Sequence, residues 1–208
     1  MTLDPSYHDV ITALLDREHL DGHPESVFAI DRDGALVYVN AGWHRFAMNN
    51  GGQPDIGDNW SLGANYFDAI GPPLESFYRD LVGRAPAFGE DQAPLSHCYQ
   101  CPGARVYREY NMLIYALPDQ AGHLIVNSRV VERRHDPETH RPGSPEFDSY
   151  LDEHGLVRQC AHCRRMASRA EPGRWDWVPA WVETPPPNLS HGICPVCMEY
   201  YFSGVAAG

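Results

Sequence analysis

The hairpin that decides the fold reads VFAIDRDGALVYVN and covers residues 27–40. Its first part, VFAID, and its last part, ALVYVN, are both apolar runs rich in β-forming residues. The Asp–Gly pair between them favours a tight turn that joins two antiparallel strands. Asn40 then stands at the expected N-cap of a helix that carries Trp43, Phe46 and Ala47. This stretch therefore predicts strand, turn, strand and helix in that order.

Three further strands are expected in LSHCYQC (95–101), RVYREYNMLIYALP (105–118) and GHLIVNSRVVERR (122–134). Two helical segments, NYFDAI (65–70) and PPLESFYRDLVGRA (72–85), separate them from the hairpin. We therefore predict an α+β fold, in which a five-stranded antiparallel sheet has helices packed on one face.

The flanks of this sheet suggest a division into four segments. Residues 6–20 place apolar side chains on a helical stripe, so residues 1–23 are expected to form an N-terminal helix. That helix either packs on its own domain or serves dimerisation and signal transmission. Residues 24–134 would form the domain that contains the sheet, 135–150 a Pro-rich linker, and 151–208 a separate cysteine-rich element.

Charge and cysteine content limit the classes of function. The chain of 208 residues has a net charge of −12 and no lysine, which argues against nucleic acid as the main partner. No apolar run approaches the roughly 20 residues that cross a membrane, and the N-terminus lacks a signal-peptide pattern. We expect a cytoplasmic protein. In a reducing compartment, Cys-x-x-Cys pairs favour metal binding or redox chemistry over structural disulfides.

Two such pairs, CAHC (160–163) and CPVC (194–197), are the strongest chemical signal in the chain. Two Cys-x-x-Cys turns brought together supply four sulfurs in a tetrahedron, the geometry that zinc prefers. A tail of about 50 residues has little core of its own, and domains of that size usually need a metal or disulfides. The sequence predicts a structural zinc site of zinc-knuckle type, with the ligands Cys160, Cys163, Cys194 and Cys197.

Other chemistries are open at these cysteines. They could form a reversible dithiol–disulfide switch, hold iron in a rubredoxin-like site, or remain buried thiols. The four-cysteine centre could therefore be the redox or metal sensor itself. A nucleic-acid-binding zinc protein is a further alternative, because Arg164, Arg165, Arg169 and Arg174 lie near the first pair.

The front of the chain resembles a PAS domain, a sensory fold of many bacterial signalling proteins. The hairpin with its D-x-x-G turn, the V-N ending of its second strand and the segment GANYFDAI (63–70) carry the resemblance, together with Tyr99 and Cys101. The tail resembles a cysteine-rich element of bacterial PAS-containing sensor proteins. There the matching residues are Cys160, Cys163, Arg164, Met166, Gly173, Trp175 and SHGICPVC (190–197).

A PAS domain implies a ligand cavity between sheet and helices, with apolar walls and a few polar groups. The candidate lining residues are aromatic or sulfur-containing; ordinary core packing is the alternative for most of them. They are Phe28, Tyr38, Trp43, Phe46, Tyr66, Cys101, Tyr110 and Met112. Cys98 and Cys101 form a third Cys-x-x-Cys, either as two separate thiols or as a redox-sensing pair.

The motifs of common enzymes are missing: the sequence has no G-x-S-x-G, no P-loop and no H-E-x-x-H. We therefore expect a non-enzymatic sensor that binds a small molecule of unknown identity or responds to redox state. Such a protein would signal by contact with another signalling protein, as a homodimer, through a shift between conformations. Neither a membrane nor nucleic acid is expected as a partner.

Overall fold

The structure is a computed structural model that describes residues 2–14, 16–49, 59–88, 92–103, 105–135 and 146–202, apart from the side chains of residues 14 and 17. The chain forms two compact units, neither of which is one continuous segment. The sheet unit comprises Met1–Ala69, Tyr78–Tyr99 and Tyr110–Val130. The cysteine unit comprises Ile70–Phe77, Gln100–Glu109 and Val131–Gly208. The four segments predicted from the sequence stay a prediction, because this grouping reflects proximity rather than independent folding.

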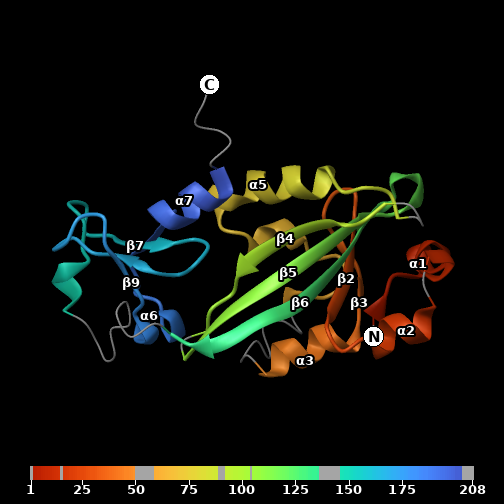
Figure 1. Ribbon diagram of the computed structural model, residues 1–208, viewed down its shortest axis with the longest axis horizontal. Coiled ribbons are helices and arrows are strands. Elements are labelled where there is room, and N and C mark those ends of the chain that lie inside the picture. The colour runs from red at the N-terminus through yellow and green to blue at the C-terminus, as the bar shows by residue number, and fades with distance from the viewer. Residues whose placement is uncertain are drawn as a thin grey trace. The chain divides into compact units, whose positions relative to one another are not determined.

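A six-stranded sheet in the order β1-β3-β2-β6-β5-β4 organises the front of the chain (Figure 1). The strand β2 pairs antiparallel with both β3 and β6, and β1 pairs antiparallel with β3. The five predicted strands are present, and the short β1 is a sixth. The strands are β1 (Thr2–Leu3), β2 (Ser26–Asp31), β3 (Leu36–Val39), β4 (Leu95–Gln100), β5 (Val106–Ala116) and β6 (Gly122–Arg134).

Helices fill the connections between these strands. The two predicted helical segments between the hairpin and β4 are confirmed, although the first is a 3₁₀ turn. The helices are η1 (Pro5–Tyr7), α1 (His8–Leu14), α2 (Arg17–Gly22), α3 (Ala41–Asn49), η2 (Tyr66–Ala69), α5 (Pro72–Gly83) and η3 (Pro118–Gln120).

Local hydrogen bonds explain the hairpin and the helix after it. The carboxylate of Asp31 accepts the N–H groups of Asp33 at 2.9 Å and Ala35 at 2.8 Å, and Gly34 takes the left-handed φ of +96° that the turn needs. Asn40 is fully buried, and its Oδ1 accepts the N–H of Trp43 at 2.9 Å. The predicted N-cap of α3 is confirmed.

The sheet is covered on both faces, whereas the sequence led us to expect helices on one. Side chains alternate along β2, so Phe28 and Ala29 point to opposite faces. Ala29 belongs to a buried cluster with Ile11 of α1 and Leu20 of α2. Phe28 instead contacts Trp43 of α3, with ring centroids 5.0 Å apart. The physical reason lies in β2 itself, whose residues Val27–Ile30 are all apolar and buried, so neither face of this strand can be left to water.

The predicted single helix over residues 6–20 is wrong, because the segment forms two short helices, α1 and α2. Asp16 takes a non-helical backbone conformation, and its side chain caps α2 by accepting the N–H of Glu18 at 3.2 Å. Its preference for an N-cap outweighs the apolar stripe. Burial of Ile11 and Leu20 against β2 agrees with the first alternative, a segment packed on its own domain.

The cysteine unit contains a four-stranded sheet in the order β10-β7-β8-β9. Beneath it, Tyr150, Val157, Met166, Val178 and Trp181 form a small core. Trp177 is also buried, whereas Trp175 lies half-buried on the edge strand β9. The elements are η4 (Phe147–Ser149), β7 (Val157–Cys160), β8 (Met166–Ala167), β9 (Trp175–Asp176), α6 (Pro179–Glu183), β10 (Leu189–Gly192) and α7 (Pro195–Phe202).

The predicted α+β class is thus confirmed, with an antiparallel sheet, packed helices and a C-terminal cluster of four cysteines. Most of the predicted Pro-rich linker (residues 136–145) lies outside the described residues. In the described part of the chain, no helix combines the length and apolar character that crossing a membrane requires.

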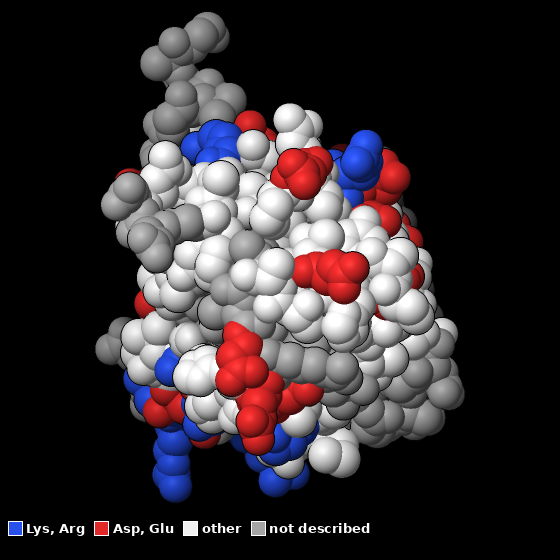
Figure 2. All heavy atoms as spheres, turned by 90° about the vertical axis from the view of Figure 1, so that its right-hand side faces the viewer, with Lys and Arg blue, Asp and Glu red and all other residues white. Residues whose placement is uncertain are grey.

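Acidic side chains lie across the middle of the face that carries α1 and α2, and basic ones lie nearer its edges (Figure 2).

Candidate metal centre and ligand-binding face

Two parallel strands bring the two Cys-x-x-Cys turns together. The strand β10 pairs in parallel with β7, so that Gly192 lies opposite Cys160. The N–H of Ala161 extends this pairing by donating to the carbonyl of Gly192 at 2.8 Å. Because parallel strands end at the same edge of a sheet, the turn after β7 and the turn after β10 meet there. The long segment between the two cysteine pairs is occupied by β8, β9 and α6.

Backbone hydrogen bonds shape each turn around its sulfurs. In the first turn, the N–H of Arg164 donates to the carbonyl of Cys160 at 3.0 Å, and Arg164 takes a left-handed φ of 61°. In the second turn, the N–H of Cys197 lies 3.5 Å from the sulfur of Cys194. The N–H of Cys194 lies 3.5 Å from the sulfur of Cys160 and so links the two turns. Such N–H···S contacts favour thiolates, the form in which cysteine binds metals.

The geometry of the four sulfurs fits a tetrahedral metal site. The Sγ atoms of Cys160, Cys163, Cys194 and Cys197 all lie within 4.8 Å of one another, and all four residues are buried. The sulfurs of Cys163 and Cys194 are 3.7 Å apart. With zinc–sulfur bonds of about 2.3 Å, the edges of a tetrahedron would be about 3.8 Å long. All four thiols are free, so the cluster is not a pair of disulfides. The donor set therefore fits a metal such as zinc.

The electrostatics of the four thiols also favour the binding of a cation among them. Hydrogen bonds from Cys163, Cys194 and Cys197 lower the pKa of the Cys160 thiol, whereas the contact with Cys160 raises the pKa of Cys163. Neighbouring thiols at this distance resist joint ionisation, because each thiolate repels the next. A divalent cation removes that conflict, since all four thiols can then ionise as its ligands.

Arg165 supplies part of this compensating charge. Burial acts to lower the pKa of its guanidinium, but the neighbouring Cys163, Cys194 and Cys197 outweigh burial and raise it. One of the arginines suggested as a nucleic-acid contact thus faces the cysteines instead. A second, Arg174, is ion-paired with Glu171 and Asp176 at 2.7 and 2.8 Å.

His162 connects the cluster to the rest of its unit. The backbone N–H of Gln100 donates to Nε2 of His162 at 3.4 Å, and Tyr201 also contacts Nε2. A backbone N–H can only donate, so Nε2 accepts and the ring hydrogen sits on Nδ1. The Nδ1 atom lies 3.6 Å from the sulfur of Cys197, to which it donates. His162 thus orients the sulfur of Cys197, while His191 is exposed on β10.

The candidate ligand-binding residues of the sheet unit mostly gather on one face of the sheet, which we call the α3 face. Phe28 contacts Trp43 and Tyr66, with centroids 5.0 and 5.2 Å apart. Phe46 meets Tyr110 edge-to-face at 5.9 Å. Met112 is buried two residues beyond Tyr110 on β5, so alternation points both side chains to the same face. Their role in binding a ligand stays a prediction.

Two candidates do not join this group. Tyr38 pairs across the strands with Ala29, so it points to the α1 and α2 face, where its hydroxyl donates to Asp21 at 3.1 Å. Cys101 belongs to the cysteine unit. Burial raises the pKa of its thiol, so that less of the reactive thiolate is present. Cys98 lies in the sheet unit, 3.9 Å from Oδ1 of Asn111.

Sequence patterns missed several polar groups of the α3 face. Three alternate residues of β6 share the face of Phe28, because they pair with residues of β2 on that face. The pairs are His123 with Ile30, Ile125 with Phe28, and Asn127 with Ser26. Among the described residues, three buried atoms there have no hydrogen-bond partner: Nε1 of Trp43, Nδ1 of His123 and Oδ1 of Asn127. No motif marks His123 or Asn127, since both stand inside an ordinary apolar strand.

No protein-family model matches the chain, and no curated protein matches it in sequence. Three similar solved structures are a photoactive yellow protein domain and two PAS domains. The photoactive yellow protein domain of the sensor histidine kinase Ppr from Rhodospirillum centenum has 16% identity and a TM-score of 0.35, with 55% of this chain and 93% of that one covered. The PAS domain of an HTR-like protein from Haloarcula marismortui has 13% identity and a TM-score of 0.34, with 54% of this chain and 91% of that one covered.

The PAS domain of BvgS from Bordetella pertussis has 16% identity and a TM-score of 0.36, with 55% of this chain and 81% of that one covered. Two of these three structures are PAS domains, the family that the front of the chain resembles in sequence. These likenesses are too low to argue for a function, and the fold described above rests on its own strand order and packing. The resemblance predicted for the cysteine-rich tail stays a prediction.

Proposed function

We propose that this protein is a non-enzymatic sensor, in which the α3 face of the sheet unit binds a small polar molecule and the cysteine unit is held together by structural zinc. It acts by protein contacts, as a cytoplasmic homodimer that passes the signal to another protein. Ligand binding shifts the populations of its conformations. Neither nucleic acid nor a membrane is its partner.

The observation that carries this proposal is the set of unpartnered polar atoms on the α3 face. A buried polar atom without a hydrogen bond costs roughly 1 to 3 kcal/mol, so native proteins rarely leave one unsatisfied. Among the residues that the structure describes, this face has three such atoms, on Trp43, His123 and Asn127. The aromatic ring of Phe28 contacts both Trp43 and Tyr66, and these rings provide an apolar wall. Aromatic walls with a few polar groups are typical of small-molecule sites.

The three atoms also define what the ligand must offer. The indole N–H of Trp43 can only donate, and Oδ1 of Asn127 can only accept. His123 and Asn127 are four residues apart on one strand, a separation of about 13 Å. A ligand that satisfies the set therefore carries an acceptor for Trp43 and polar groups far enough apart to reach both His123 and Asn127.

The first experiment looks for that ligand directly. The purified full chain is denatured, and the released small molecules are analysed by mass spectrometry, with an absorption spectrum recorded beforehand. We expect one organic compound per chain, bound again when added back to the washed protein. A chain that releases no compound and is not stabilised by extracts of its source cells would contradict the proposal.

A matched pair of variants tests the role of the polar atoms. Asn127→Leu removes an unpartnered oxygen while keeping the shape, so the ligand-free protein should lose no stability and should bind the compound at least about tenfold more weakly. Asn111→Leu is the control: Oδ1 of Asn111 accepts a hydrogen bond from Ser96 at 2.8 Å, so its loss should destabilise the protein. Equal destabilisation by both substitutions would refute the role assigned to Asn127.

The zinc part of the proposal rests on the sulfur geometry. Metal analysis is expected to give one zinc per chain, held through mild peroxide treatment. Rapid zinc release with disulfide formation would instead identify the cysteines as a redox switch, and iron in place of zinc would identify a rubredoxin-like site.

A further inference from the structure

An open pocket of about 610 Å³ lies on the cysteine unit, away from the four sulfurs. It is bounded by the segment around Tyr150 and Arg158 and by the hairpin that joins β8 to β9. Its volume falls in the range of pockets that hold small molecules. Three arginines, Arg158, Arg169 and Arg174, contribute to its lining, and so does Trp175.

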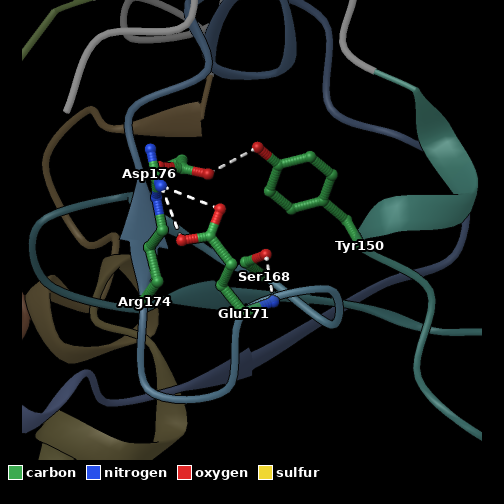
Figure 3. A network of polar contacts seen from close by, with 5 residues as sticks. All are labelled: Tyr150, Ser168, Glu171, Arg174 and Asp176. Atoms are coloured by element: carbon green, nitrogen blue, oxygen red, sulfur yellow. Dashed lines mark hydrogen bonds and ion pairs between the residues drawn. The ribbon is translucent and has the colours of Figure 1, made fainter. Parts of the chain in front are cut away.

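One wall of this pocket is a preorganised polar network (Figure 3). The hydroxyl of Tyr150 donates to Asp176 at 2.7 Å, and Nε of Arg174 donates to the other oxygen of the same carboxylate at 2.8 Å. Arg174 also forms an ion pair with Glu171 at 2.7 Å. Both Tyr150 and Asp176 are buried, so the wall is fixed before any ligand arrives. Arg174 is consequently a structural arginine rather than a free cation.

The guanidinium groups of the other two arginines are available to bind an anion. Across the described ranges, no ion pair joins Arg158 or Arg169 to a carboxylate. Arg169 donates one N–H to the carbonyl of Leu151 at 3.4 Å, which leaves most of its five donors available. Ser168 accepts the N–H of Glu171 at 3.1 Å through its hydroxyl oxygen, so its own hydrogen can be donated. These donors suit a phosphate or carboxylate group.

Trp175 offers a surface for a planar ring. It is half-buried on β9, and the guanidinium carbon of Arg158 lies 5.9 Å from its ring centroid. A close guanidinium–ring stack in this same chain, Arg79 over Phe67, measures 4.1 Å. Arg158 is therefore not stacked closely on the indole of Trp175. A ring that stacks there would gain aromatic contact and lie near the positive charge.

Acidic residues set an upper limit on the charge of the occupant. Asp152 and Glu153 also line the pocket, so its net charge is small despite the arginines. A nucleic acid would bring many phosphates against these carboxylates, whereas a small molecule can present a single anionic group to Arg158 and Arg169. The pocket is thus suited to a compact ligand rather than to a polyanion.

We propose that this pocket binds a small molecule in which a planar aromatic ring carries a phosphate or carboxylate group. The ring lies against Trp175, and the anionic group is held by Arg169, Arg158 and the hydroxyl of Ser168. The site is independent of the ligand proposed for the α3 face, which lies in the other unit.

The test is calorimetric titration of the full, metal-loaded chain with AMP, phenyl phosphate and indole-3-acetate, alongside inorganic phosphate and adenosine. At least one of the first three is expected to bind about tenfold or more tightly than inorganic phosphate and adenosine do. Arg169→Gln should weaken that binding roughly tenfold, because a hydrogen-bonded charge is lost. Arg84→Gln is the control, since Arg84 is an exposed arginine of the sheet unit paired with Asp80. Its binding should equal that of the unchanged chain.

The outcome is decisive in either direction. Trp175→Leu should also weaken binding, and if that variant fails to fold, Arg169→Gln still decides, with metal content and circular dichroism checking its fold. Absence of millimolar binding by all three probes overturns the proposal. So does binding that survives Arg169→Gln, or inorganic phosphate binding as tightly as the aromatic anions. A salt dependence as steep as that of a multi-phosphate contact would identify a nucleic-acid surface instead and likewise overturn it.

Discussion

Replacement of one cysteine of the cluster tests the metal centre most directly. In Cys160→Ser the buried thiol at the end of β7 becomes a hydroxyl, which does not ionise as a thiol does. Structural zinc contributes about 10 to 16 kcal/mol of apparent binding free energy in small zinc domains. A typical domain has a total stability of only about 5 to 15 kcal/mol. The core of the cysteine unit is small, so the binding free energy lost with the metal should exceed the stability that this core provides, and the unit should unfold.

The assay follows the tryptophans of this unit. Trp177 is 1% exposed and Trp181 is 7% exposed, so unfolding of the unit should shift their emission to longer wavelength. We expect Cys160→Ser to lack zinc and to show this shift without denaturant. The unchanged chain should show the same shift when a strong chelator removes its metal.

Cys98→Ser is the matched control, because Cys98 belongs to the sheet unit and lies near Asn111 rather than in the cluster. It should keep one zinc per chain and unchanged emission. The reasoning is refuted if Cys160→Ser binds zinc as the unchanged chain does, or if a chelator strips the metal and the emission and amide-exchange protection of the unit stay as they were.

Three further predictions follow from single residues. Arg164→Gly should raise the free energy of unfolding in denaturant titrations by about 1 kcal/mol, because Arg164 holds a left-handed φ of 61° that glycine adopts without strain; a loss of stability would contradict this. Asn40→Ala should cost at least about 2 kcal/mol in the same titrations, since its side chain caps α3 and also accepts the N–H of Val27 at 3.0 Å, and a neutral result would count against that role. Burial lowers the pKa of His97 to about 4, below its unfolded value of 6.5. The contribution of neutral His97 to the free energy of unfolding is therefore complete above pH 6.5 and is lost as the pH falls toward 4; with allowance for solvent screening it is about 1 to 2 kcal/mol. Thermal unfolding at several pH values should detect this loss, and His97→Gln should remove it.

Local patterns in the sequence were sufficient for elements whose contacts lie close together in the chain. The turn at Asp31–Gly34 and the cap at Asn40 depend on hydrogen bonds over two to four residues, so their sequence signals suffice. The spacing of Cys160, Cys163, Cys194 and Cys197 likewise predicted that each Cys-x-x-Cys turn would present its two sulfurs together, because that depends on local geometry alone, and the four sulfurs do form one cluster.

The apolar stripe in residues 6–20 misled for a related reason. Periodicity reports which side chains are buried, and Ile11 and Leu20 are buried as that pattern requires. It does not report whether the backbone between them is continuous. The break at Asp16 depends on a competition between a side-chain cap and helix propagation, which the stripe does not describe.

The tertiary structure decided everything that depends on distant partners. Parallel pairing of β7 with β10 places the two cysteine turns at one edge, and Gln100 fixes the tautomer of His162 from 62 residues away. The polar atoms left unpartnered on the α3 face, and the division of the arginines between the cysteines, the Asp176 network and the open pocket, also have no local signature. The physical reason is that sequence patterns record each residue's own preference for water or apolar surroundings, whereas a site is defined by which groups meet and which polar groups are left without a partner.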